Sequence, residues 1–157
     1  MTNQPDITGV IRPAVPADLP RILEIESLCF DKQWRDANFN PALKDIFLVY
    51  EQENILGFII ACSCEIARRG VIMRVAVHPQ ARGRGVASLL MSKALAALKE
   101  KKVACVELDV EITKTNVKRL YEKFGFKTLR VVNPDVDYEE EAFYVMKLRF
   151  SNFEETG

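Results

Sequence analysis

The sequence predicts a single α/β domain with a mixed, mostly antiparallel sheet, one central parallel strand pair and helices on both faces. Two observations predict this class. Short apolar runs of strand length are interspersed with segments of helical periodicity along the chain. Near the middle, a strand, a loop, a long helix and another strand follow one another, and a helical crossover of this kind joins parallel strands. At 157 residues, the chain suits one domain, 1–157, with its core at about 7–150.

The first half should contain strands and two helices on an antiparallel framework. Pro16 precedes a helix whose apolar side recurs at helical spacing, and Pro41 interrupts a second, irregular helix. The polar stretch 51–54 separates two apolar runs, as in a hairpin. The expected elements are a strand at 7–13, a helix from Pro16 to about 28, an irregular helix at 34–45, hairpin strands at 47–50 and 55–66, and a strand at 71–77.

The second half begins with a long helix, expected at 85–101, whose apolar face follows the 3.6-residue period. A strand at 104–110 follows. The next helix places Val117, Leu120, Tyr121 and Phe124 on one face, and Gly125 stands where a glycine commonly ends a helix. Two final strands are expected at 126–132 and 142–150.

The loop between the strand at 71–77 and the long helix is suited to bind phosphate. A helix N-terminus leaves its first N–H groups unpaired and carries about half a positive charge. Gly83 and Gly85 allow that backbone to approach a ligand closely. A mononucleotide P-loop is excluded because Val86-Ala87 follows the last glycine, where Lys-Ser/Thr is required. A dinucleotide fingerprint is excluded because it requires three spaced glycines.

The composition excludes several other classes. Lys+Arg and Asp+Glu are equal at 22 each, which argues against a general nucleic-acid or membrane partner. No apolar run reaches the ~20 residues of a membrane helix, and the first residues do not resemble a signal peptide. The cysteines lie in apolar segments, and a single His leaves no paired metal-ligand set. We expect a cytoplasmic protein with reduced cysteines and no metal.

The strand at 104–110 carries a line of acidic residues. Alternation places Glu107, Asp109 and Glu111 on one face. If this face opens on a cleft, like charges would raise one another's pKa, which suits a general base and would attract a cationic amine. Alternatively, the face is simply solvated. A third possibility is that Arg74 pairs with Asp109 or Glu107 and lowers the pKa of that carboxylate.

Tyr121 has two interpretations. Its place on the apolar face of its helix is typical of a core aromatic residue. A phenol could also protonate a leaving thiolate. His78, the only histidine, is more simply explained as a turn residue after the strand than as a catalyst.

Two motifs resemble those of the GNAT acetyltransferase superfamily. The segment Arg82-x-x-Gly85-x-Ala87 resembles its acyl-CoA-binding motif, and Leu120-Tyr121-x-x-x-Gly125-Phe126 resembles the motif whose Tyr often protonates departing CoA. The segments at 25–34 and 138–148 resemble the N-terminal (α-amino) protein acetyltransferases, including the ribosomal-protein alanine N-acetyltransferases. The resemblance covers about 11–148 and implies a GNAT-like fold.

The resemblance also implies the site residues. Tyr121 would be the general acid and Asp109 the general base, working through water because Asp is shorter than the usual Glu. The acceptor would contact Phe30, Glu107 and Tyr138. Lys114 stands where many relatives have a cofactor-contacting Asn, so either Lys114 or Asn116 would take that role. The cofactor would be bound by Val75, Ala76, Val77, Arg82, Gly83, Arg84, Gly85, Val86, Ala87, Ser88 and Asn116.

The implied function is transfer of acetyl from acetyl-CoA to an amine, most simply a protein or peptide N-terminal α-amine, by direct attack on the thioester. Two alternatives stay open. One is acetylation of a small amine, such as a polyamine, an antibiotic or an amino acid. The other is a non-catalytic acyl-CoA-binding module. The expected partners are acetyl-CoA and the acceptor, without nucleic acid or membrane, and the expected state is a monomer or weak dimer.

Overall fold

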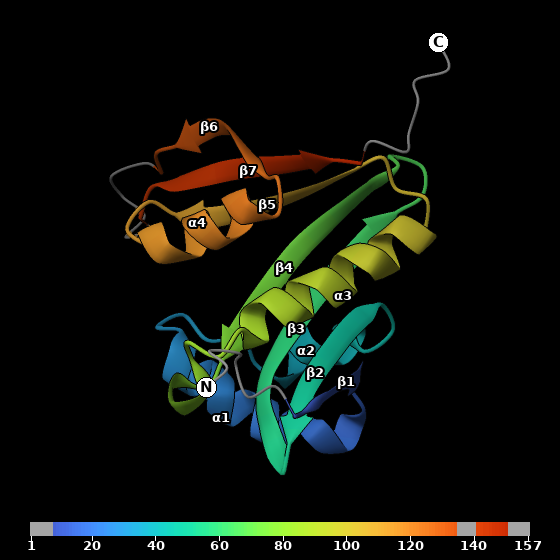
Figure 1. Ribbon diagram of the computed structural model, residues 1–157, viewed down its shortest axis with the longest axis vertical. Coiled ribbons are helices and arrows are strands. Elements are labelled where there is room, and N and C mark those ends of the chain that lie inside the picture. Colours follow the sequence, from blue (N-terminus) through green and yellow to red (C-terminus); the bar gives the residue numbers. More distant parts are fainter. Residues whose placement is uncertain (1–7, 135–140, 151–157) are drawn as a thin grey trace, which may run out of the picture. The chain divides into compact units, whose positions relative to one another are not determined.

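The computed structural model describes residues 8–134 and 141–150, and the elements follow the predicted order (Figure 1). The strands are β1 (Val10–Pro13), β2 (Ile46–Gln52), β3 (Asn54–Cys64), β4 (Arg69–Val77), β5 (Cys105–Glu111), β6 (Lys127–Val132) and β7 (Phe143–Arg149). The helices are η1 (Pro16–Asp18), α1 (Leu19–Cys29), α2 (Asp36–Ala42), η2 (Pro79–Ala81), α3 (Val86–Glu100) and α4 (Thr115–Lys123).

Hydrogen-bonded strands follow the order β1-β2-β3-β4-β5-β7-β6. β4 and β5 are parallel, whereas β1–β2, β2–β3, β5–β7 and β6–β7 are antiparallel. This confirms the mixed sheet with its central parallel pair. The chain divides into two compact units, Met1–Cys62 with Met73–Leu98, and Ser63–Ile72 with Lys99–Gly157.

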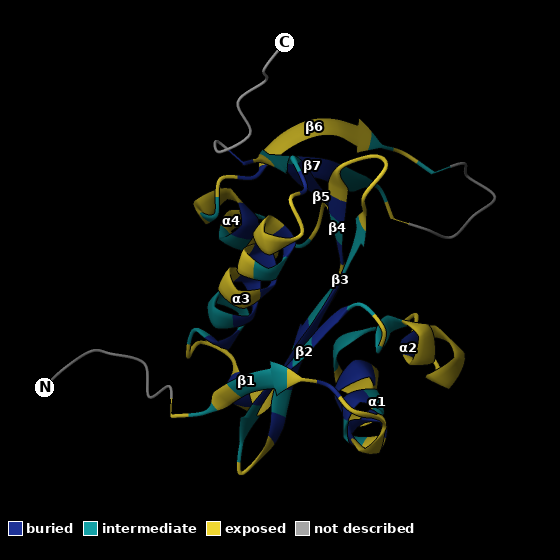
Figure 2. Cartoon of the chain, turned by 90° about the vertical axis from the view of Figure 1, so that its right-hand side faces the viewer, coloured by how far each residue is buried: buried dark blue, intermediate teal, exposed yellow. Residues whose placement is uncertain are grey.

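The first unit has a large apolar core on one face of its strands. Alternate residues of β2 and β3 project to this face and meet the apolar sides of α1 and α2. Phe39 of α2 is fully buried, with its ring centroid 5.7 Å from that of Phe58 and 6.0 Å from that of Phe47. Figure 2 shows α1 and α2 on this side of the strands.

Helix α3 covers the other face of the same strands. Gly57 makes this close packing possible, because a Cβ there would lie only 3.2 Å from Val86 Cγ1 and 3.3 Å from Leu90 Cδ1. The buried residues of α3 recur at helical spacing, as expected. Within the first unit, helices therefore lie on both faces of the strands (Figure 2), as predicted.

Element boundaries differ from expectation at the prolines. The first helix begins with the 3-10 turn η1, because Pro16 and Pro20 lack N–H donors and are tolerated only near a helix start. The second helix is shorter than expected and spans Asp36–Ala42, with Pro41 in its last turn. The first strand is described only from Val10, and the predicted residue Ile7 lies outside the described residues.

In the second unit, β5 is sandwiched between β4 and β7. Val106, Leu108 and Val110 of β5 are buried, whereas Asp109 and Glu111 are exposed, so the predicted alternation is confirmed. α4 packs on the apolar face: a Cβ at Gly125, just after the helix, would meet Leu148, which pairs with Val106. The acidic line therefore lies on the face opposite α4.

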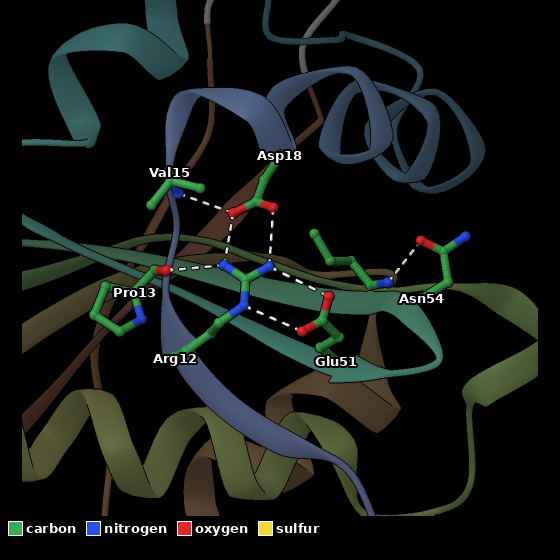
Figure 3. Close-up of polar contacts among 7 residues, drawn as sticks. Arg12, Pro13, Val15, Asp18, Glu51 and Asn54 are labelled. Atoms are coloured by element: carbon green, nitrogen blue, oxygen red, sulfur yellow. Dashed lines mark hydrogen bonds and ion pairs between the residues drawn. The ribbon is translucent and has the colours of Figure 1, made fainter.

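A group of ion pairs joins β1 to η1 and β2 in the first unit (Figure 3). The guanidinium of Arg12 donates two hydrogen bonds to the carboxylate of Asp18, at 2.8 and 2.9 Å, and also reaches Glu51. Asp18 is 8% exposed and accepts a further bond from the N–H of Val15. These hydrogen bonds, foremost those from Arg12, lower the pKa of Asp18 below its usual 3.8 although burial opposes the shift.

Replacing Asp18 with Asn should therefore destabilise the fold in a pH-dependent way. A depressed carboxylate pKa contributes stability above the unfolded-state value and loses it as pH falls through the folded-state value. We expect Asp18→Asn to lower the free energy of unfolding by about 2 kcal/mol at pH 7. Urea denaturation at pH 7 and below pH 3.8 measures the difference, which should shrink at the lower pH. A constant difference would show that the ionised pair contributes nothing.

Candidate active site

The loop after β4 forms the first part of the site. His78 directly follows the strand, and its ring Nδ1 accepts a hydrogen bond of 3.1 Å from the N–H of Gln80, which agrees with its interpretation as a turn residue. Gly83 and Gly85 have φ values of +78° and +83°, in the left-handed region that favours glycine. Nothing lies within 4 Å of a Cβ built at Gly83, so the loop surface is open there.

α3 begins directly after this loop, at Val86. By helix geometry, the first N–H groups of a helix have no partner within it, and they point outward from its N-terminus with the positive end of the dipole. The residues at this end are Val86, Ala87 and Ser88. The loop thus has the shape and polarity that bind a pyrophosphate.

Arg82 connects the loop to two neighbouring segments of the first unit. Its Nε donates to the carbonyl of Val77 at 3.1 Å, and one terminal nitrogen lies 3.4 Å from the Sγ of Cys29. Cys29 itself contacts the same carbonyl at 3.4 Å. Arg82 therefore connects the loop to β4 and to the end of α1, and both Arg82 and Arg84 are exposed. The sequence interpretation did not identify Cys29 as part of this region.

β4 offers backbone groups next to the loop. Its ladder with β5 covers only Arg69, Gly70 and Val71, and Val75–Val77 lie beyond it. Of these residues, Ala76 belongs to the core formed with α1 and α2. Alternation then directs Val75 and Val77 to the opposite face.

Tyr121 of α4 is a buried residue of the second unit. It is 7% exposed, and its ring centroid lies 6.0 Å from that of Phe126. Burial raises the pKa of Tyr121 to about 12, so the phenol stays protonated at neutral pH. Among the described residues, no hydrogen bond is formed by its hydroxyl. The side chain thus packs like a core residue and retains a proton that it can donate.

A backbone motif fixes the end of α4. The N–H of Gly125 donates to Glu122 O at 3.0 Å, and the N–H of Phe126 donates to Tyr121 O at 3.1 Å. With Gly125 at φ +99°, this is a Schellman motif, as its sequence position predicted. On the predicted apolar face, however, Val117 is 37% exposed, so Tyr121 is the buried residue of the helix.

The acidic line on β5 is balanced by basic residues. Glu107 forms an ion pair of 3.1 Å with Arg69 and stands opposite Lys147 of β7 in the strand register. Asp109 stands opposite Val145, and Arg130 of β6 stands opposite the same valine. The expected acidic face is therefore a face of mixed charge.

Asp109 remains the exposed carboxylate in the middle of this line. Desolvation raises its pKa above the ordinary value, Arg130 opposes that shift, and Glu107 adds to it. A raised pKa suits a group that accepts a proton near neutrality. Arg130 was not identified in the sequence because the β6–β7 register shifts between Thr128 and Arg130.

The suggested pairing of Arg74 with Asp109 or Glu107 is wrong. Arg74 donates from Nε and from a terminal nitrogen to the carboxylate of Glu26 on α1, with the Nε contact at 3.1 Å. Glu26 is fully buried and also accepts the N–H of Trp34 at 2.9 Å. Because a bidentate partner holds Arg74 in the first unit, it does not lower the pKa of Asp109.

The remaining predicted residues are distributed between the units. Phe30 follows α1 in the first unit, and its ring lies under the guanidinium of Arg74. Asn116 is exposed in the first turn of α4, and Lys114 is the residue that precedes that helix. Tyr138 lies outside the described residues.

In residues 8–134 and 141–150, no group of three or more potential metal-ligating side chains is found. Within those ranges, no helix is both long and apolar enough to cross a membrane. On the first unit's surface, a hollow of about 640 Å³ is lined mainly by the turn between α1 and α2, including Trp34.

Comparison with known proteins relates this chain to acetyltransferases. The putative [ribosomal protein bS18]-alanine N-acetyltransferase of Bacillus subtilis (strain 168) is 27% identical over 116 residues, which cover 70% of this chain and 75% of that protein. The ribosomal-protein-S18-alanine N-acetyltransferase of Escherichia coli has a similar fold, with a TM-score of 0.82, 21% identity and coverage of 96% and 99% of the two chains.

A third relative is Arabidopsis thaliana Naa50, solved in complex with the bisubstrate analogue CoA-Ac-MVNAL. Its TM-score is 0.80 at 20% identity, with 92% of this chain and 100% of that chain covered. These similarities agree with the GNAT-like fold expected from the motifs. A sequence model of the acetyltransferase (GNAT) family matches residues 19–126, which include the β4 loop, α3 and the Tyr121 helix. The chain therefore belongs to the acetyltransferase (GNAT) family.

Proposed function

We propose that this protein is an acetyl-CoA-dependent N-acetyltransferase that acetylates the N-terminal α-amine of a protein or peptide. The observation that carries the proposal is the left-handed Gly83 and Gly85 loop at the start of α3, next to Val75–Val77. The similarity to the B. subtilis ribosomal-protein acetyltransferase supports the acceptor class. The family match spans segments of both units, which supports one acetyltransferase domain. Cytoplasmic location, and a monomer or weak dimer, stay predictions.

The first unit supplies cofactor binding in this proposal. Backbone groups of Val75 and Val77 align the pantetheine arm as an added strand. The N–H groups from Gly83 to Ser88 bind the pyrophosphate at the positive end of α3. Arg82 and Arg84, which are both exposed, add positive charge, and Arg82 also supports the loop through its bond to Val77. Asn116 stays a proposed cofactor contact.

The second unit supplies proton transfer. The α-amine, once neutral, attacks the thioester carbonyl carbon, and a backbone N–H of Val75–Val77 stabilises the oxyanion. As the C–S bond breaks, Tyr121 gives its proton to the CoA thiolate. Asp109 accepts the proton lost by the amine through a water molecule, and Tyr121 recovers a proton from solvent. An α-amine with a pKa of about 7.7–8.0 requires little base strength.

The alternative of a small amine acceptor (a polyamine, an antibiotic or an amino acid) stays open. An acidic face on β5 would attract a cationic amine of either acceptor class. Arg69, Lys147 and Arg130 lie along that face and offset its charge. Phe30, Glu107 and Tyr138 stay the proposed acceptor contacts, with Glu107 already paired to Arg69.

Release of CoA with a peptide panel tests the proposed function. The panel varies the first two residues of free-amine hexapeptides, and spermidine serves as the small-amine comparison. We expect turnover with a subset of peptides and little with spermidine. Preferred turnover of spermidine would support the small-amine alternative. Acetyl-CoA binding without turnover of any amine would support a non-catalytic module and contradict the proposal.

Replacing Arg130 with Gln should change the pH dependence. Asp109 acts as a base only when ionised, so kcat/KM falls as pH drops through its pKa. Arg130 lowers that pKa, and its removal should therefore move the acidic limb of the profile to higher pH. Arg149→Gln is the matched control. Arg149 lies on β7, on the sheet face that also carries Arg130, but it stands opposite Cys105 and not Asp109. Equal profiles for the two variants would argue against Asp109 as the base.

A further inference from the structure

The turn between α1 and α2 is organised around one guanidinium. Residues 30–35 form no regular helix or strand, and side-chain contacts add to the backbone hydrogen bonds that hold the ends of this turn. Arg74 of β4 lies 3.7 Å from the ring centroid of Phe30 and 5.2 Å from that of Trp34. It also donates to the carbonyl of Lys32 at 3.0 Å. Three residues of one short turn thus contact a single side chain.

Glu26 holds that guanidinium in place. Its side chain is 1% exposed, that of Arg74 is 16% exposed, and the pair is joined through two guanidinium nitrogens. The same carboxylate accepts the N–H of Trp34, which links the pair to the end of the turn. A buried carboxylate must be paired and hydrogen-bonded, so Glu26 and Arg74 depend on each other.

The cluster formed by Glu26, Phe30, Trp34 and Arg74 lies apart from the cofactor loop. Arg74 alternates with Val75 on β4, and it shares a face with Ala76, which packs against α1 and α2. α3, whose N-terminus follows the glycine loop, covers the other face of the first unit's strands. The cluster therefore holds the turn at 30–35 against the face of β4 that packs on α1 and α2. Trp34 also lines the hollow of about 640 Å³, so the cluster fixes one wall of a concave surface.

We propose that Glu26 and Arg74 are positioning residues that hold the turn at 30–35 in the shape that binds the amine acceptor. This inference rests on the proposed function, in which Phe30 contacts the acceptor. Arg74 directly precedes the Val75–Val77 segment, so the pair connects the acceptor turn to the strand that binds acetyl-CoA. Loss of the pair should weaken acceptor binding and leave cofactor binding nearly unchanged.

Arg74→Lys is the informative variant because it keeps the charge. Lysine lacks the planar fork and the stacking surface, so it cannot contact Glu26, Lys32 and Phe30 together. We expect the peptide KM to rise about tenfold, with the KM for acetyl-CoA within about twofold of the wild-type value. Hydrogen exchange of residues 30–35 should become faster in the same variant.

Two controls separate positioning from stability. Asp18→Asn breaks a comparable ion pair elsewhere in the first unit (Figure 3), so it should lower Tm without changing the peptide KM. The double variant E26L/R74M replaces a buried pair by apolar side chains, which often restores stability. We expect that variant to regain thermal stability while its peptide KM stays high.

The outcomes distinguish this inference from the proposed function. A wild-type protein that turns over no peptide contradicts the proposed function, and the variants are then not needed to decide. If the wild type acetylates peptides, an unchanged peptide KM in Arg74→Lys overturns the inference. It is also overturned if E26L/R74M regains a normal peptide KM together with its stability, or if Asp18→Asn raises the peptide KM as much as Arg74→Lys.

Discussion

Tyr121→Phe is expected to lower kcat about 100-fold, at the lower end of the range for loss of a positioned general acid. The phenyl ring keeps the packing against Phe126, so the fold and the KM for acetyl-CoA should change little. Tyr144 of β7 provides the control phenol, because it lies in the same unit beside Lys118 of α4. Steady-state kinetics should show normal kcat for Tyr144→Phe. A normal kcat for Tyr121→Phe would mean that Tyr121 is only a core residue.

The raised pKa of Tyr121 also predicts how kcat and stability depend on pH. Because burial raises it to about 12, the phenol remains protonated throughout the working range of the enzyme. Any decline of kcat between pH 8 and 10 must then have another origin and should persist in the Phe variant. The stability gained by burying the neutral phenol is complete below pH 10 and is lost as pH rises through about 12.

Gly85→Val is expected to raise the Kd for acetyl-CoA about 100-fold. Gly85 has φ +83°, a conformation that a β-branched residue avoids, so the loop must rearrange. Loss of two charge-assisted N–H contacts to a phosphate, at about 1.5 kcal/mol each, corresponds to that factor. Isothermal titration with acetyl-CoA measures the change.

Gly125→Ala is the control for backbone strain. Gly125 has φ +99°, and a Cβ there would lie 3.1 Å from Leu148 Cδ1, so the substitution should lower Tm. It lies outside the cofactor loop and should leave the Kd for acetyl-CoA unchanged. An unchanged Kd for Gly85→Val, or equal effects of the two variants, would contradict phosphate binding by the loop.

The features that could be predicted from the sequence are those set by local chemistry. Helical periodicity identified α3 and α4, and Gly125 was correctly placed after the end of α4 because a Schellman motif depends on a few consecutive residues. The parallel pair followed from the strand–helix–strand order. Gly83 and Gly85 were expected to let the backbone approach a ligand closely, and the structure adds that both have positive φ.

The features that could not be predicted depend on partners distant in the sequence. Arg74 pairs with Glu26, 48 residues away, rather than with Asp109. One signal was present: Glu26 stands four residues after Ile22 on the buried side of α1, where a charge needs a partner. Arg130 and Asp109 stand on either side of Val145 because the register of β6 shifts before Arg130. Simple alternation along the strand cannot predict such a shift.

The position of the acetyl group on a peptide tests the proposed acceptor most directly. The substrate is a hexapeptide from the active panel with one free α-amine and one internal lysine. At pH 7 roughly a tenth of the α-amine is neutral, against less than about one in a thousand lysine side chains. Fragment mass spectrometry should place a single acetyl group on the α-amine, and a peptide with a blocked N-terminus should not react. Acetylation of the lysine, or undiminished acetylation of the blocked peptide, would contradict N-terminal acetylation.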